Sequence, residues 1–256
     1  MNVFLVLLVA LHLPTIVLCW GPFTHQYFAS QDEAHGTSSP FRTGGSSPDA
    51  VKKLENSLHT FPFASTLYKT ATTNGNMDDI EFSLGYGCHL AHDFVGHHTK
   101  GFLNPQEDHP IELAADTYIH DTIDKSSFGE ITTAMVDLIS KASAAASVDY
   151  PFIKAVTSTQ VQGSVGKFKT LTTAEAVALE LNRWTYKKQL VKDSYCNITD
   201  FNGAVNNFNR ALNWSVLACN FWRETMTKKY VNGTEAETMV ENYVDELFTR
   251  HNGTSC

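Results

Sequence analysis

The chain has 256 residues, of which 43% are hydrophobic, and a formal net charge of −8 at neutral pH. This length and apolar content suit one large domain with a well-buried core and exclude a disordered chain. The acidic balance provides no overall positive groove for nucleic acid, which disfavours a nuclease, although bound cations would supply local positive charge.

Residues 1–19 contain no charged side chain and are almost continuously apolar. The segment is short for a membrane helix and is interrupted by a histidine and a proline, so it indicates a secretory signal peptide. Val17 and Cys19 are acceptable at the third and first positions before a cleavage site, which would leave Trp20 as the new N-terminus. The start of the segment has no Lys or Arg, so an uncleaved anchor is the alternative.

Two further features favour the secretory route and an extracellular or lumenal location. Four Asn-x-Ser/Thr sequons lie in the C-terminal third, and an even number of cysteines follows the signal peptide. The cysteines predict one or two disulfides, expected among the last three. The predicted glycosylation sites are Asn197, Asn213, Asn232 and Asn252, and the cysteines are Cys88, Cys196, Cys219 and Cys256.

The chain then divides by composition. Residues from Trp20 to about Ser65 are rich in Gly, Pro and Ser, which predicts loops and turns. Further on, apolar residues recur at helical spacing, and few stretches alternate as strands do. No repeat or linker marks a boundary, so the prediction is one all-α domain over residues 20–256. Helices are expected from Asp78–Asp79 through Val95, within 126–147, from Thr172 onward, over 205–222 and over 239–248.

Nine of the ten histidines after the signal peptide lie in the first half of the chain. His89, Asp93 and His97 recur every four residues, so a helix would carry all three on one face. Imidazole and carboxylate both bind zinc, and the helix would fix their separation. A surface ion pair or a satisfied core histidine is the alternative for each residue. His92 and His98 lie off this face, and we expect them beside the ligands or in solvent.

The segment that contains His109 and Glu112 is open to two interpretations. The residue after His109 is a proline, which fits the first position of a helix; His109 would then be the cap and Glu112 a capping-box residue. Alternatively, the two side chains point the same way and bind a metal. Asp116, one turn further, would share that face or orient a ligand.

Three more candidates are weak when each is taken alone. His25 follows the expected processing site, Asp49 ends a Gly-Ser-Pro segment, and His59 precedes a Phe-Pro-Phe sequence. By default Asp49 is a turn residue and His59 is a partly buried aromatic.

In this order, the elements resemble the zinc-dependent phospholipase C family, which shares its fold with the S1/P1-type nucleases. The resemblance covers about residues 20–116, and the remainder matches only in being helical. It implies a cleft with three zinc ions, in which Asp49 would also accept a proton from the attacking water. The implied ligands are Asp49, His59 and His89 for the first ion, Asp93 as the bridge to the second, His25 with the free amine and carbonyl of Trp20 for the second, and His97, His109 and Glu112 for the third.

Two spacings depart from the bacterial phospholipases. Glu112 follows His109 by three residues instead of four, which leaves Glu112 the least secure ligand. His97 follows Asp93 by four residues, a shorter gap that is similar to the N-terminal domain of glycosylphosphatidylinositol-specific phospholipase D. That similarity favours phospholipids or lipid anchors as substrates.

The leading hypothesis is therefore a secreted zinc-dependent phospholipase that hydrolyses a phospholipid or other phosphodiester and contacts membranes only transiently, because no basic amphipathic stretch offers an anchor. An S1/P1-like single-strand nuclease or nucleotidase is the nearest alternative, with nucleic acid the less favoured partner. It would need stacking aromatics, for which Phe61, Phe63 and Tyr86 are the candidates. A secreted zinc-binding glycoprotein without turnover is the third hypothesis.

Overall fold

The computed structural model of the chain describes residues 20–97, 108–122, 129–193, 200–228 and 230–250. All regular structure within these ranges is helical, without a strand, which confirms the all-α prediction. The helices are α2 (Pro22–Ser30), α3 (Ser39–Lys52), the 3₁₀ helix η1 (Asn56–Leu58), α4 (Phe61–Asn74), α5 (Met77–Gly96), α6 (Asp108–Thr122), α7 (Thr133–Asp149), α8 (Ser158–Asn182), α9 (Tyr186–Asp193), α10 (Phe201–Lys228) and α11 (Gly233–Arg250).

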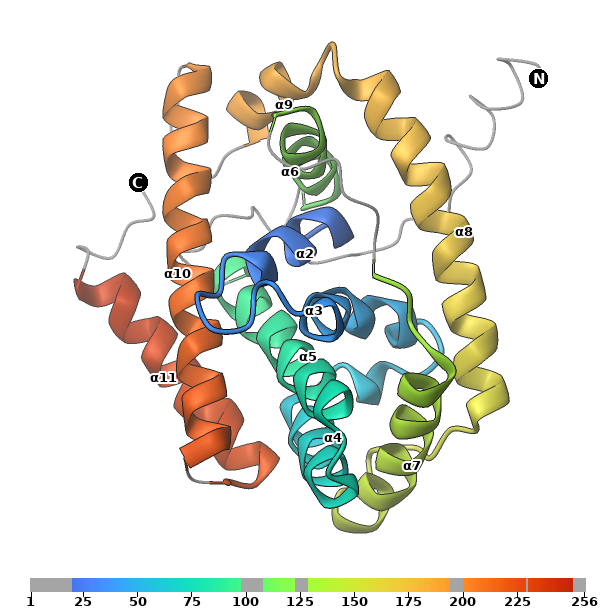
Figure 1. Cartoon of the computed structure of the whole chain (residues 1–256). Coiled ribbons are helices and arrows are strands. Elements are labelled where there is room, and N and C mark those ends of the chain that lie inside the picture. Colours follow the sequence, from blue (N-terminus) through green and yellow to red (C-terminus); the bar gives the residue numbers. More distant parts are fainter. Residues whose placement is uncertain (1–19, 98–107, 123–128, 194–199, 229, 251–256) are drawn as a thin grey trace.

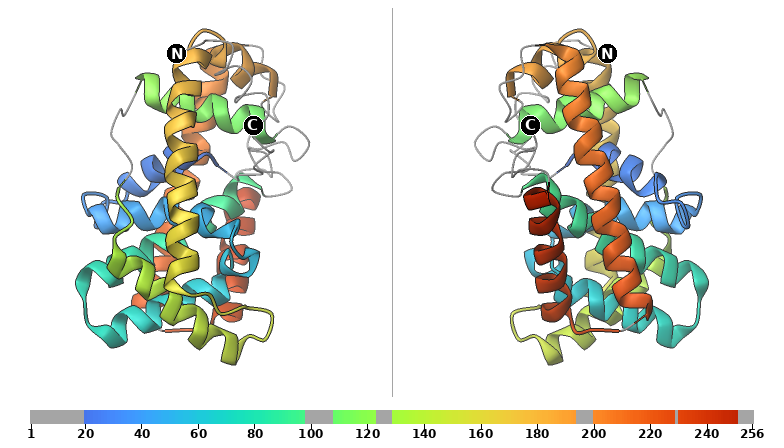
Figure 2. Two further views of the ribbon diagram at one scale, coloured as in Figure 1. Left: turned by 90° about the vertical axis from the view of Figure 1, so that its right-hand side faces the viewer. Right: turned by 90° about the vertical axis from the view of Figure 1, so that its left-hand side faces the viewer.

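Helix α5 runs through the middle of the molecule, with α10 and α11 on one side and the long α8 on the other (Figure 1). It packs against α3, α4 and α10. Nearly every residue from Phe82 to Gly96 is buried, because neighbouring helices cover α5 on all sides. The two side views show α6 and α9 together at one end, next to the upper halves of α8 and α10 (Figure 2). Because neighbouring helices cover α5, a polar residue in its second half is buried away from water.

Helices α3 and α5 cross at very close range, because glycines face the crossing from both sides. A Cβ atom on Gly44 would lie 2.1 Å from the carbonyl oxygen of Phe82, and one on Gly85 would lie 2.0 Å from that of Phe41. Any larger residue at either position would force the helices apart. The crossing brings the backbone of α3 into hydrogen-bonding reach of side chains on α5.

The apolar side chains form two clusters. The large core is built mainly from α3, α4, α5, α7, α10 and α11 and includes Phe63, Tyr86 and Trp222. The small core lies between the N-terminal segment, α6, α9 and the first half of α10, and its largest member is Trp20. Helix α2 contributes to both cores, so the polar residues on α2 lie where the two cores meet.

A disulfide joins Cys88 of α5 to Cys219 of α10, across 131 residues of sequence. The prediction that the bonds would form among the last three cysteines is thus wrong for Cys219. Its partner is on α5 because α10 packs along that helix. Cys196 and Cys256 lie outside the described residues.

The expectation of loops over residues 20–65 is also wrong, since α2, α3, η1 and the start of α4 occupy this segment. Prolines in the first turn begin three of these helices, a position where a missing N–H costs nothing. The Gly-Gly-Ser-Ser run at residues 44–47 is helical because it packs at the close crossing with α5. Small residues here reflect helix packing rather than a turn.

Three predicted helix starts need correction. Helix α8 begins at Ser158 behind a capping box formed by Thr157 and Gln160, so Thr172 lies inside it. Asn76 caps α5, while the two aspartates that follow it occupy the first turn. Helix α6 includes His109, so this residue is not the cap. The helix expected within 126–147 is α7, which begins at Thr133.

Two of the predicted glycosylation sites can be located. Asn213 is exposed on α10, and the exposed Asn232 caps α11 by accepting a hydrogen bond from the amide of Glu235 (3.0 Å). Asn197, Asn252 and the predicted signal peptide lie outside the described residues. Among the helices that are described, none is long and apolar enough to span a bilayer.

Candidate metal centre

Five of the predicted ligands meet in one buried cluster, which we call the His/Asp cluster. They come from α2, α3, the residue after η1, and α5. Within the cluster two groups of three offer ligand atoms that all lie within 4.8 Å of one another. The first group is His25, His89 and Asp93, and the second is Asp49, His59 and His89.

Asp93 faces three imidazoles at once. Its Oδ1 atom lies 3.2 Å from His25 Nε2, and its Oδ2 atom lies 3.3 Å from His59 Nε2 and 3.4 Å from His89 Nε2. The His25 and His89 rings stack with their centroids 3.7 Å apart. Each imidazole therefore presents the same ring nitrogen, Nε2, to the shared carboxylate.

The carboxylate of Asp49 is buried without any hydrogen-bond donor among the described residues. The nearest cationic or donor groups are His89 Nε2 at 3.7 Å and His59 Nε2 at 4.0 Å from its Oδ1 atom. A buried charge without a partner is costly, whereas a divalent cation would satisfy both oxygens. The donor set of imidazole and carboxylate fits zinc in this respect.

The orientation of His89 is fixed from behind by helix α3. Its Nδ1–H donates a hydrogen bond of 2.8 Å to the carbonyl of Gly45, which leaves Nε2 for the cluster. Metal-binding histidines are usually held by such a bond from the second ring nitrogen. The close crossing of α3 and α5 makes this contact possible.

The two carboxylates differ in their electrostatics. Burial raises the pKa of Asp49 well above its usual value of 3.8, and the neighbouring charge of Asp93 raises it further. Burial also acts to raise the pKa of Asp93, but the imidazoles of His89 and His25 and hydrogen bonds from His25 and His59 outweigh it and bring the pKa well below 3.8. Asp93 is therefore the anion of the pair before any cation binds.

Burial likewise lowers the pKa of His25 and, more strongly, that of His89. For His89 the neighbouring His25 adds to this effect, while for both rings Asp93 acts in the opposite direction. A lowered pKa keeps the imidazoles neutral near pH 7, which is the form that binds metals.

Helix α2 is held in place by Asp116 of α6. The carboxylate of Asp116 accepts hydrogen bonds from the amides of Phe23 (3.2 Å) and Thr24 (2.8 Å) and from the Thr24 hydroxyl (2.5 Å). It thereby caps a helix whose own cap residue, Gly21, has no side chain. A Cβ on Gly21 would lie 2.2 Å from Asp116 Oδ2. Asp116, which was expected to share the ligand face or to orient a ligand, thus caps the helix that carries His25.

The remaining predicted ligands lie around the cluster. Trp20 is fully buried, and its indole N–H donates to the carbonyl of His92 (3.1 Å). Glu112 is buried on α6, and His97 lies at the C-terminal end of α5. The described residues do not bring these two into either group of three. The side chain of His109 and the residue His98 lie outside the described part, so the third zinc set stays a prediction.

The sequence did not identify two groups that contact the predicted ligands. The carbonyl of Gly45 becomes a partner of His89 only through the helix crossing. His92 is fully buried, with its Nδ1 atom 3.4 Å from Nδ1 of His25. From its position off the ligand face we expected it either beside the ligands or in solvent, and the sequence did not show that it contacts His25.

No known protein family model matches the chain, and comparisons with curated proteins and with solved structures likewise found no match.

Proposed function

We propose that this protein is a secreted zinc-dependent phosphoric ester hydrolase that cleaves the phosphodiester of a phospholipid or lipid anchor. The single observation that supports the proposal most is the His/Asp cluster. Two groups of three potential ligands share His89, and Asp93 belongs to one of them. The Asp49 carboxylate of the other group is buried without a hydrogen-bond donor among the described residues. Closely spaced sites of this kind suit in-line displacement at phosphorus.

Zinc bound here would neutralise the phosphodiester and lower the pKa of a bound water. Asp93 would hold its place between the imidazoles as the common anion, because its pKa is already well below the usual value. Asp49 would take a proton from the attacking water. His89 would keep its orientation through the bond to Gly45.

The surroundings of the cluster suggest how a substrate approaches. The side chains of His59 and Asp93 retain 11% and 8% exposure, whereas those of His25, His89 and Asp49 have none. Substrate would therefore enter from the side of His59.

The nuclease alternative has weaker support. It needs aromatic side chains that are free to stack on bases. Phe61, Phe63 and Tyr86 are at most 2% exposed, because they pack into the large core. The acidic net charge of −8 also disfavours binding of a polyanion.

Zinc content and lipid hydrolysis together test the proposal. The protein, secreted and purified with Trp20 at its N-terminus, is expected to contain two to three zinc ions per chain by the family pattern. It should release phosphocholine, choline or an anchor headgroup from lipid vesicles in a chelator-sensitive reaction. Asp93→Asn should reduce turnover more than any other single ligand change, since Asp93 adjoins every imidazole of the cluster.

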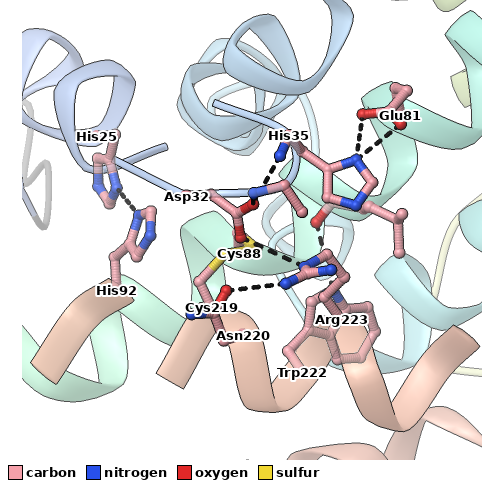
Figure 3. The surroundings of a disulfide bond; sticks show 12 residues. His25, Asp32, His35, Glu81, Cys88, His92, Cys219, Asn220, Trp222 and Arg223 are labelled. Atoms are coloured by element: carbon pink, nitrogen blue, oxygen red, sulfur yellow. Dashed lines mark hydrogen bonds and ion pairs between the residues drawn. A yellow bond between two sulfur atoms is a disulfide. The ribbon is translucent and has the colours of Figure 1, made fainter. Parts of the chain in front are cut away.

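His35→Gln provides a matched control, because His35 pairs with Glu81 away from the cluster (Figure 3). This variant should keep both zinc and activity. A native protein free of zinc would contradict both enzyme hypotheses. Bound zinc without lipid turnover would favour the non-catalytic glycoprotein, and digestion of single-stranded DNA instead of lipid would favour the nuclease.

A further inference from the structure

His92 makes three contacts with the N-terminal segment, one through its backbone carbonyl and two through its ring. Its carbonyl accepts the indole N–H of Trp20 (3.1 Å), its ring meets Phe28 at nearly a right angle, and its Nδ1 atom lies 3.4 Å from that of His25. The last contact is drawn in Figure 3, where the two rings face each other from α2 and α5. Their planes differ by 24°, so the two nitrogens meet nearly edge to edge.

The hydrogen bond between the rings has only one possible direction once His25 binds a metal. A metal on Nε2 of His25 requires a lone pair there, so the ring proton must be on Nδ1. The only acceptor that the described residues offer to this N–H is Nδ1 of His92. His92 must then carry its own proton on Nε2. Bonds of this kind are often long before metal or substrate binds.

We propose that His92 is a positioning residue that accepts the Nδ1–H of His25 and thereby holds this ligand, and the mature N-terminus with it, in place for zinc. The inference rests on the proposed function. It also implies an exchange of tautomers. Without zinc, His92 Nδ1–H donates to His25, and His25 Nε2–H faces Asp93 Oδ1 at 3.2 Å.

The exchange is balanced in protons. When zinc binds, one proton leaves His25 Nε2, one crosses from His92 Nδ1 to His25 Nδ1, and one is taken up at His92 Nε2. Both rings are neutral before and after. The proton on His92 Nε2 then has no acceptor among the described residues, a cost that zinc binding must outweigh.

Nuclear magnetic resonance of protein labelled with ¹⁵N-histidine tests this directly, because a protonated and a bare ring nitrogen have different shifts. In the zinc-loaded protein we expect the proton of His25 on Nδ1 and that of His92 on Nε2. In the zinc-free protein we expect the opposite pair. A zinc-loaded protein in which His92 keeps its proton on Nδ1 overturns the proposal, and this measurement needs no variant to fold.

Two substitutions test the role independently. His92→Asn keeps an acceptor close to the position of Nδ1, so zinc affinity should stay within a few-fold of wild type. His92→Phe keeps the ring but not the acceptor, and zinc affinity at one site should fall by about 10–100-fold, as for other partners of metal-binding histidines. His35→Gln serves again as the control.

The outcomes separate the two proposals. If wild type binds zinc and a folded His92→Phe binds it equally well, the positioning role is wrong while the proposed function stands. A wild-type protein that takes up no zinc removes the proposed function and the role of His92 with it. If the asparagine and phenylalanine variants lose affinity equally, His92 is not acting as an acceptor, and the proposal also fails.

Discussion

Asp49 and Asp93 belong to one cluster, but their surroundings shift their pKa values in opposite directions. Asp93 lies 3.2 to 3.4 Å from three imidazole nitrogens, whereas Asp49 is close to a like charge and lies 3.7 and 4.0 Å from the nitrogens of His89 and His59. Lys52 acts to lower the pKa of Asp49 but does not outweigh burial. Asp49 therefore destabilises the zinc-free protein and becomes favourable only when a cation is present.

Asp49→Asn is expected to stabilise the zinc-free protein and to weaken zinc binding. The folded-state pKa of Asp49 lies above 3.8, so its contribution to stability is complete below that pH and is lost as the pH rises through the folded-state value. Asparagine does not titrate, so the gain should grow with pH and reach about 1–3 kcal/mol. Urea unfolding of both proteins at pH 5 and pH 8, after chelation, measures it.

The same two proteins should reverse their order when zinc is added, because the ion binds the carboxylate and not the amide. Equal stability of the two zinc-free proteins at pH 8 would show that Asp49 is not a strained group. Zinc affinity unchanged by the substitution would remove it from the ligand set.

Helix α2 is short, and its place depends on another helix. It has nine residues, carries His25, and lacks a cap of its own because Gly21 precedes it. The cap comes from Asp116 of α6, 92 residues away in sequence from Thr24. One carboxylate thus joins the helix of His25 to the helix of Glu112.

Asp116→Ala should cost about 1–3 kcal/mol of stability, because it leaves buried amides of α2 without an acceptor. It should also lower the zinc affinity of the site that contains His25. Asn76→Ala is the matched control: it removes the cap of α5 at the end far from the cluster. The control should lose about 1 kcal/mol and keep its zinc affinity.

Thermal unfolding and zinc titration of the two variants measure both quantities. If the two variants lose stability but retain the same zinc affinity, Asp116 holds the helix without affecting the ligand.

Over the whole molecule, sequence patterns predicted the parts that depend on local spacing. Helix α5 was expected because apolar residues recur from Ile80 to Val95, and His89 and Asp93 share a face on it. The segment 20–65 was mistaken for loops, because glycine and serine at a close helix crossing resemble those of a turn. That distinction depends on a partner helix about 40 residues further along the chain.

In the candidate site, too, the sequence predicted what depends on local spacing and missed what depends on distant segments. His25, Asp49 and His59 come from separate segments, and only the resemblance to a family pattern placed them together before the fold did. The disulfide partner of Cys219 could not be found from spacing, because Cys88 is 131 residues away. Neither could the contact between His25 and His92, which depends on how α2 lies on α5.

Replacing both Cys88 and Cys219 by serine should lower the stability of the protein by about 2–5 kcal/mol, since the bond closes a very long loop. Unfolding followed with and without a reducing agent measures the effect. The reductant should lower the midpoint of wild type by more than that of the double variant. An equal response of the two proteins would show that the bond does not form.

The cluster lies early in the chain, but the helix that fastens it lies late. Cys88 is next to His89 and is bonded to Cys219 of α10. The same helix supplies the indole of Trp222, which packs on Gly87. This part of α10 is synthesised more than 120 residues after Cys88. During synthesis, the segments that carry the imidazoles are therefore complete well before α10 can cover them. A chain that stops short of α10 has every residue of the His/Asp cluster and lacks the support on one side of α5. The hydrolase proposed here would therefore acquire its activity only when the polypeptide is nearly complete.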